Sequence, residues 1–170
     1  MHRPGFHRLW TAFPDHVRYP TLETLYTSLG GAAQRNIHVR GFGPDGNTCA
    51  SRISVALNAA AAPIDPVFVR IAAAATLGTS RGDLIIYRVA DLRRYLVAAL
   101  GKPEVDSTLP FDDSFRRRKG IIAFSVNWKS ATGHIALWDG SVYREPVHDN
   151  YATYVDGMFR TSRGEFWELH

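Results

Sequence analysis

The sequence has very little cysteine: Cys49 is the single cysteine among 170 residues. One thiol cannot form an internal disulfide, so the redox compartment of the protein cannot be deduced from bridges. The sequence also lacks the paired-Cys and His-Glu-x-x-His spacings of zinc sites, and the Gly-x-x-x-x-Gly-Lys loop that binds phosphates. We therefore expect neither a metal ion nor another cofactor.

Long apolar runs are missing as well. The longest run, residues 67–77, contains Arg70 and Thr76 and is too short to span a bilayer. No apolar segment of the length of a secretory signal follows the first residues. We expect a protein that is made in the cytoplasm without a signal peptide and that does not insert into membranes.

What is present is the composition of a folded, soluble chain. The apolar fraction is 45% and the charged fraction 21%, as in globular proteins, and residues 1–170 fit one domain. The net charge of +4 suits an anionic partner, such as nucleic acid, phosphate or a bacterial wall, without choosing among them. The basic run at residues 116–119 has no accompanying recognition motif, so we expect a solvated loop and no nucleic-acid binding.

Helical patterns fill the first hundred residues and strand patterns fill the rest. Apolar spacing and capping residues predict helices over residues 4–13, 21–29, 48–61 and 91–100, with a further helix or a packed irregular segment at 67–77. Alternating or buried apolar runs predict strands over residues 84–89, 120–127, 134–138, 141–147 and 165–169. Loops or turns are expected at residues 32–46, 110–119 and 129–133. This order indicates an α+β fold, with the helical first half packed on an antiparallel sheet from the second half.

Cys49 stands at the start of one predicted helix, after a Gly-, Pro- and Asp-rich stretch at residues 41–46. Asn47 or Thr48 can cap the helix, which places the thiol in its first turn. The unpaired amides and partial positive charge there stabilise a thiolate, so this is a suitable position for a nucleophile. The alternative is that Cys49 is a small buried apolar residue of the core.

A nucleophilic cysteine needs a histidine, and His134 is the best candidate. It begins a predicted strand behind Gly133, whereas the other histidines lie near the termini, near Pro14 or in loops, where we expect them to be solvated. These are His2, His7, His16, His38, His148 and His170.

The hairpin after His134 suggests which carboxylate orients it. A two-residue turn at Asp139-Gly140, without a bulge, would place Glu145 opposite His134 on the same face of the sheet. Asp139 is an odd number of residues from His134 and belongs to the other face or to the turn. We therefore prefer Glu145 over Asp139 as the orienting group, and expect His148 and Asp149 in a solvated loop or at the rim of the site.

Short motifs along nearly the whole chain make it similar to a known family. The chain resembles the fourth family of type VI secretion amidase effectors, which are papain-like and NlpC-like peptidoglycan amidases. The order and spacing of the motifs carry the resemblance: Arg3-Pro4-x-Phe6 with Trp10 and Phe13, Gly30-Gly31 with Asn36-Ile37, Asn47-x-Cys49 with Arg52, Ser54, Leu57 and Asn58, Tyr87-Arg88-Val89, Gly101-Lys102-Pro103, Lys119-Gly120-Ile121-Ile122 and Gly133-His134-x-x-Leu137-Trp138-x-Gly140-Ser141.

The resemblance implies a papain-like cysteine peptidase fold and hydrolysis of the γ-D-glutamyl–meso-diaminopimelate bond of wall peptides. Cys49 and His134 match the catalytic pair, and Glu145 stands where the family has a catalytic Asp. Tyr143 and Val147 occupy the positions at which many relatives form a disulfide. Further candidates for binding the oxyanion or the substrate are Asn47, Trp138 and Asp139.

The resemblance also implies partners and a place of action. The expected partners are the peptidoglycan peptide, a cognate immunity protein and the type VI secretion apparatus, which would export the protein to the periplasm of target bacteria. On its own the protein is expected to be monomeric. Two other functions stay open at this point: a thiol acyltransferase with the same three groups, and a non-catalytic wall-binding or partner-binding module.

Overall fold

The computed structural model describes residues 3–39, 46–108, 112–127 and 133–170. Most of the stretch at 41–46, the start of the loop at 110–119 and most of the turn at 129–133 lie outside these ranges. The helices are α1 (Phe6–Ala12), α2 (Leu22–Leu29), α3 (Gly31–Arg35), α4 (Cys49–Ala59), α5 (Pro66–Ile71), α6 (Val89–Leu100), α7 (Asp112–Phe115) and α8 (Pro146–Asp149). The strands are β1 (Thr76–Gly78), β2 (Leu84–Ile86), β3 (Val105–Ser107), β4 (Gly120–Val126), β5 (Gly133–Trp138), β6 (Val155–Asp156) and β7 (Phe159–Glu168).

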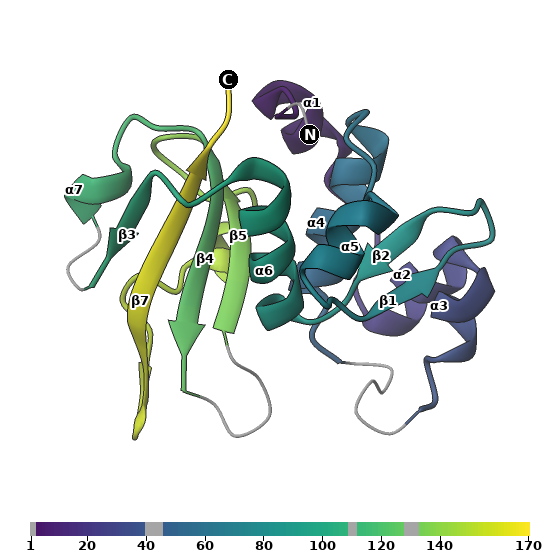
Figure 1. The fold of residues 1–170 in the computed structure, drawn as a ribbon. Coiled ribbons are helices and arrows are strands. Elements are labelled where there is room, and N and C mark those ends of the chain that lie inside the picture. Colours follow the sequence, from purple (N-terminus) through teal and green to yellow (C-terminus); the bar gives the residue numbers. More distant parts are fainter. Residues whose placement is uncertain (1–2, 40–45, 109–111, 128–132) are drawn as a thin grey trace.

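The helices of the first half gather on one side of the molecule and the main sheet forms the other (Figure 1). Helix α6 lies beside strand β5, and α1, α4 and α5 lie beyond it. The two ends of the chain meet, because the amide of Phe6 donates to the carbonyl of His170 at 2.8 Å. The predicted α+β class, with an antiparallel sheet from the second half, is confirmed.

The main sheet is antiparallel, with the strand order β3-β7-β4-β5 and with β6 paired to β7. Strand β5 is therefore an edge strand among the described residues. Strands β1 and β2 form a separate antiparallel pair beside the helices. The edge strand matters for function, because helix α4 contacts β5 at this edge.

Each face of the sheet carries its own apolar cluster, as the alternation of side chains along a strand requires. In β4, Ile121 and Ala123 pack in the cluster formed with the helices, whereas Ile122 and Phe124 pack in a second cluster with Phe115. Since β4 is covered on both faces, it reads as a nearly continuous apolar run.

The capping signals of two helices are confirmed. Thr21 and Thr24 form a reciprocal capping box at the start of α2. Gly30 ends α2 and Gly101 ends α6, with φ of 65° and 92°. A backbone with a positive φ of this size is accessible to glycine without a steric penalty, which explains glycine at both helix ends.

Some local predictions were wrong. Residues 32–46 were expected to form a loop, but α3 begins at Gly31, directly after the turn that Gly30 allows. Residues 67–77 were expected to be helical or irregular along their length, but α5 ends at Ile71 and Thr76 starts strand β1. The described part of the loop at 110–119 contains the short helix α7.

The expected second strand of the hairpin, residues 141–147, was also wrong. Trp138 pairs with Tyr143 through an isolated bridge, rather than with Ser141 across a two-residue turn. The cause is local: Oδ1 of Asp139 accepts hydrogen bonds of 2.8 Å from the amides of Ser141 and Val142, which closes a longer loop. The chain then turns into α8, whose first residue is Pro146.

Candidate active site

Cys49 is the first residue of α4 and is almost completely buried. Its amide donates to Oδ1 of Asn47 at 3.0 Å, so Asn47 satisfies one of the amides that a helix start leaves unpaired. Thr48 occupies the capping position but makes no side-chain capping bond. The thiol therefore lies at the positive end of the helix dipole, as predicted.

His134 lies near the start of β5, and its imidazole is close enough to Cys49 for the sulfur to act on its pKa. Its Nε2 lies 2.9 Å from Oδ1 of Asp149, which leaves Nδ1 as the nitrogen available to the thiol. The ring stacks on Tyr151, with a centroid distance of 4.3 Å, and only 6% of the residue is exposed. Cys49, His134 and Asp149 thus form one connected line of polar groups.

The backbone before His134 requires glycine. A Cβ atom on Gly133 would lie 2.0 Å from the carbonyl oxygen of Phe124 on the neighbouring strand. Such a close approach of two backbones is possible only without a side chain, and it helps to set the position of His134, the next residue of β5.

The surroundings of His134 favour its charged form. Burial lowers the pKa of the imidazole, but the negative charge of Cys49 and the hydrogen bonds to Asp149 and Cys49 outweigh it and raise the pKa to about 9. At neutral pH this geometry stabilises a protonated imidazole beside Cys49. The pair is therefore arranged for nucleophilic chemistry.

Asp149 is held firmly within α8. Its Oδ2 accepts a 3.1 Å hydrogen bond from the amide of Glu145, and its own amide donates to the carbonyl of Glu145 at 2.8 Å. Only 3% of Asp149 is exposed, so the expectation of a solvated loop or rim was wrong for this residue. Pro146 is the sequence feature that could have indicated this, because proline is favoured at the first position of a helix and so suggests that the strand ends before it.

Glu145 does not face His134, so the predicted pairing was wrong. Its carboxylate instead accepts from the backbone amide of His16 at 2.6 Å and lies 2.8 Å from Nδ1 of that residue. The longer loop changes the register, and the start of α8 turns the Glu145 side chain toward the α1–α2 connection. His16, expected to be solvated, is half-buried and stacks on His148 with a centroid distance of 3.9 Å.

Arg52 connects the start of α4 to the α1–α2 connection. Its guanidinium is fully buried and donates to Oγ1 of Thr48 at 2.8 Å, to the carbonyl of Tyr19 at 2.6 Å and to the carbonyl of Pro14. Burial lowers the pKa of Arg52, while nearby carboxylates, including Glu145, act in the opposite direction. In the sequence, Arg52 stands out only as one member of the motif around Cys49. No local pattern in the sequence indicates that an arginine on this helix is buried.

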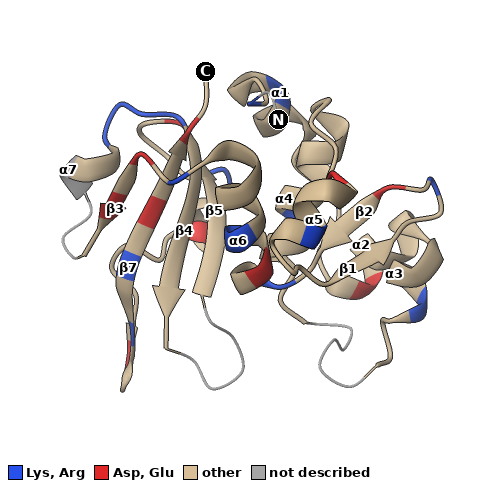
Figure 2. Ribbon diagram, in the orientation of Figure 1, with Lys and Arg blue, Asp and Glu red and all other residues tan. Residues whose placement is uncertain are grey.

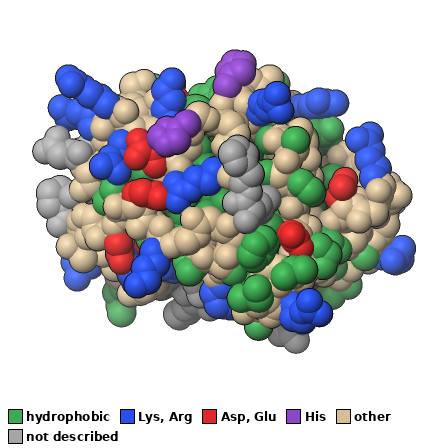
Figure 3. Space-filling view, turned by 45° about the horizontal axis from the view of Figure 1, so that its top comes forward, with side chains coloured by type: hydrophobic (Ala, Val, Ile, Leu, Met, Phe, Trp, Pro, Cys, Tyr) green, Lys and Arg blue, Asp and Glu red, His purple; other side chains and the backbone are tan. Residues whose placement is uncertain are grey.

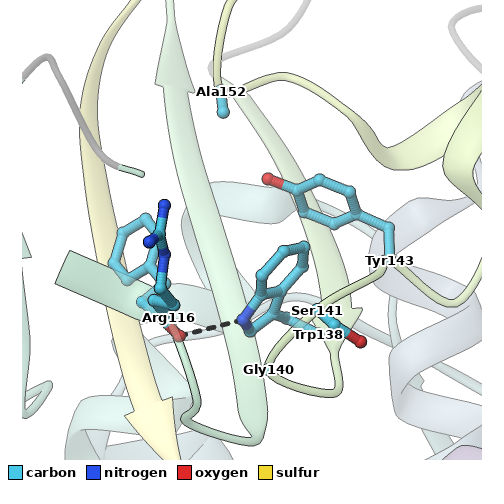
Figure 4. Close-up of a pocket in the computed structure, with 7 residues that line it drawn as sticks. Arg116, Trp138, Gly140, Ser141, Tyr143 and Ala152 are labelled. Atoms are coloured by element: carbon cyan, nitrogen blue, oxygen red, sulfur yellow. Dashed lines mark hydrogen bonds between the residues drawn. The ribbon is translucent and has the colours of Figure 1, made fainter. Parts of the chain in front are cut away.

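The remaining candidates, Trp138 and Asp139, make other contacts. The carboxylate of Asp139 belongs to the loop, where hydrogen bonds from Val142 and Ser141 outweigh burial and lower its pKa. Trp138 lines a pocket of about 400 Å³ and donates from its indole nitrogen to the carbonyl of Phe115 at 2.9 Å (Figure 4). The pocket is also lined by Arg116, Gly140, Ser141, Tyr143 and Ala152.

The surface around these elements carries charges of both signs. The segment between α7 and β4 holds the basic run, of which Arg118 pairs with Glu168 at 3.4 Å (Figure 2). The face drawn in space-filling form shows acidic side chains interspersed with the basic ones (Figure 3). None of the helices in the described ranges is long and apolar enough to cross a membrane.

Comparison with known proteins gives a consistent result. The profile of the family described as "Type VI secretion system (T6SS), amidase effector protein 4" (Tae4) matches residues 46–167. No curated protein sequence gives a significant match.

Solved structures match over almost the full length. A chain in the structure of Tae4 from Salmonella typhimurium with the immunity Tai4 from Enterobacter cloacae is 31% identical, with a TM-score of 0.82, and the match covers 99% of this chain and 100% of that one. Tae4 from Enterobacter cloacae, solved alone, is 29% identical, with a TM-score of 0.79 and coverage of 99% and 98%. The Tae4–Tai4 complex from Enterobacter cloacae contains a chain that is 29% identical, with a TM-score of 0.82 and coverage of 99% and 100%.

Proposed function

Because the chain belongs to the Tae4 family of amidase effectors of the type VI secretion system, we propose that it hydrolyses the γ-D-glutamyl–meso-diaminopimelate bond of peptidoglycan peptides. Cys49 is the nucleophile, His134 is the acid and base, and Asp149 orients His134. The observation that carries the proposal is that these three side chains lie together, although Cys49 is far from His134 and Asp149 in the sequence. Glu145, expected in the third role, is not part of this line.

Acylation begins with the thiolate–imidazolium pair. The sulfur of Cys49 attacks the γ-glutamyl carbonyl carbon, a carbon–sulfur bond forms, and the carbonyl electrons move to the oxygen. When this tetrahedral intermediate collapses, the carbon–nitrogen bond breaks and His134 gives its proton to the leaving amine. Asp149 keeps the ring in position through Nε2, as the acid does in other nucleophile–histidine–acid sites.

The developing oxyanion needs a donor, and the amide of Cys49 is the nearest candidate. In the structure this amide donates to Oδ1 of Asn47, so the asparagine oxygen occupies the place that the substrate oxygen would take. We propose that the substrate displaces Oδ1 of Asn47 and that the amide then stabilises the oxyanion.

Deacylation uses the same groups in reverse. Neutral His134 takes a proton from water, the hydroxide attacks the thioester carbon, and collapse releases the new carboxyl group and the Cys49 thiolate. His134 is again protonated, so each turnover consumes one water and restores the starting ion pair. The pocket beside Trp138 is proposed to hold another part of the wall peptide.

Delivery and inhibition follow from the family. As a type VI effector the protein is secreted toward target cells, and we propose that it acts in their periplasm, where peptidoglycan is accessible. The similar Salmonella and Enterobacter proteins were solved in complex with Tai4 immunity proteins. We propose that an immunity protein of this kind binds the chain in the producing cell.

Mass spectrometry of digested peptidoglycan tests the proposal. Purified wall peptides incubated with the protein should yield products cut between D-glutamate and diaminopimelate, and Cys49→Ala should yield none. Intact substrate with the unmodified protein, or undiminished cleavage by Cys49→Ala, would overturn the proposal. Products joined to added amines would identify an acyltransferase instead.

A further inference from the structure

A second cluster of polar side chains lies beside the proposed catalytic line. Its members are His16, Glu145 and His148, and one ligand atom from each lies within 4.8 Å of the other two. His16 comes from the α1–α2 connection, 129 residues before Glu145, so the fold brings the cluster together. We propose that these three residues form a binding site for a divalent transition-metal ion, with Zn²⁺ as the best-suited ion.

The donor set suits that ion. Two imidazoles and one carboxylate are ligands that Zn²⁺ accepts, with water completing a tetrahedral shell. The two nitrogen donors favour zinc and related transition metals over Mg²⁺ and Ca²⁺, which prefer an all-oxygen shell. The sequence offered no sign of this site, because the histidines are not spaced on one helix or strand.

Two of the three ligands are already held in place. The Glu145 carboxylate is 8% exposed and is fixed by the amide of His16 at 2.6 Å. Its 2.8 Å contact with Nδ1 of His16 holds a proton between the two groups, and a metal ion would replace that proton. His148 is exposed and makes no side-chain hydrogen bond within the described part of the chain, so its ring can turn toward the ion.

Charges of both signs surround the cluster. Arg52 lies close enough to act on His16 and opposes a bound cation, but Glu145, Asp15 and Asp149 act on Arg52 with the opposite sign.

A metal ion at this position would join the α1–α2 connection to α8. Helix α8 also carries Asp149, whose carboxylate is hydrogen-bonded to the amide of Glu145 at 3.1 Å. The ion would thus help to hold α8, and with it the carboxylate of Asp149, in place. Binding itself does not depend on the proposed amidase reaction.

Isothermal titration calorimetry with ZnCl₂ tests the site on the tag-free, full-length Cys49→Ser protein. The substitution removes the thiol, because Cys49 and His134 could otherwise bind zinc themselves. We expect one equivalent of zinc per chain, and His148→Ala in the same background should weaken binding by at least about tenfold. His7→Ala removes an exposed histidine from α1, outside the cluster, and should leave binding unchanged.

Cobalt provides an independent readout. Co²⁺ bound to the Cys49→Ser protein should give the visible absorption of a tetrahedral site, and the Glu145→Gln and His148→Ala variants should each lose it. Circular dichroism checks that both variants fold. Absence of zinc binding by the Cys49→Ser protein, or equal binding by folded His148→Ala, would overturn the proposal.

Discussion

The main-chain amide of Glu145 donates a hydrogen bond of 3.1 Å to Oδ2 of Asp149. The other oxygen of the same carboxylate lies 2.9 Å from Nε2 of His134. One oxygen therefore fixes the carboxylate within α8, while the other fixes the imidazole. Because the amide of Asp149 also donates to the carbonyl of Glu145, the acid is in place before a substrate arrives.

Removing the charge of Asp149 should therefore impair turnover severely. Asp149→Asn keeps the shape of the side chain but loses the negative charge that holds His134 in its tautomer and stabilises the imidazolium. In comparable triads such a change costs up to about 10⁴-fold in kcat, and we expect a loss of at least about 100-fold here. Initial rates of wall-peptide cleavage at saturating substrate measure it.

Glu145→Gln is the matched comparison, because Glu145 lies only four residues before Asp149, at the start of α8. The amide oxygen of the glutamine can still accept from the His16 amide, so a loss within about tenfold is expected, smaller than that of Asp149→Asn. Asp139→Asn, in the loop, should retain most of the activity. A Glu145→Gln variant more impaired than Asp149→Asn would return the orienting role to Glu145.

The raised pKa of His134 predicts a dependence on pH. The pKa is about 9 in the folded protein, above the ordinary 6.5, so the protonated form stabilises the fold. This stabilisation is complete below about pH 6.5 and is lost as the pH rises through about 9. Turnover should fall over the same alkaline range, because the imidazolium that protonates the leaving amine disappears.

NMR titration of the His134 ring measures this pKa directly. In Cys49→Ala the charge and hydrogen bond of the thiol are gone, so the His134 pKa should drop. A value near 6.5 in the unmodified protein would contradict the proposed thiolate–imidazolium pair.

Much of the fold could be predicted because its signals are local. Thr21 caps α2 through its own side chain, and Gly101 ends α6 with a left-handed backbone. The positions of Cys49 at a helix start and of His134 on a strand follow from the same kind of pattern. Their mutual approach could not be read from spacing, because it depends on how α4 meets the edge strand β5.

The third member of the site was missed for a physical reason. A two-residue turn would place Glu145 opposite His134, but Oδ1 of Asp139 organises a longer loop, and Pro146 starts a helix where a strand was expected. Asp139 and Pro146 are both local signals, and together they indicate a strand that ends before Glu145. The contacts of Glu145 with His16, by contrast, join segments 129 residues apart and leave no local trace.

Gly133→Ala should disturb the site through the backbone. The added Cβ would lie 2.0 Å from the carbonyl oxygen of Phe124, so β5 must shift and carry His134 with it. Overpacking of this kind costs about 1–3 kcal/mol, and turnover should fall as well. Gly78→Ala in β1 is the control, since its Cβ would meet no atom within 4 Å. Chemical denaturation should give a clearly lower free energy of unfolding for Gly133→Ala than for Gly78→Ala. Equal free energies of unfolding would refute the steric argument.

Arg52→Met should destabilise the protein strongly. The substitution leaves the buried carbonyl of Pro14 and the partly buried carbonyl of Tyr19 without their donor, and it removes the cation beside several carboxylates. Breaking a buried charged network typically costs about 3–5 kcal/mol. Arg35→Met, at an exposed position of α3, should change the free energy of unfolding by less than about 0.5 kcal/mol. Similar urea midpoints for the two variants would contradict a structural role for Arg52.

Asn47 provides the test of the oxyanion proposal, because its Oδ1 holds the Cys49 amide at 3.0 Å where the substrate oxygen is expected to bind. An aspartate at position 47 would bind that amide more tightly and would repel both the thiolate and the developing oxyanion. Losing one oxyanion donor costs about 10²–10³-fold in kcat, and Asn47→Asp should approach that range. Asn47→Ser keeps a neutral oxygen that can cap the helix and that a substrate can displace, so it should lose much less. If the two variants cleave wall peptides at equal rates, the Cys49 amide does not stabilise the oxyanion, and the donor must come from another residue.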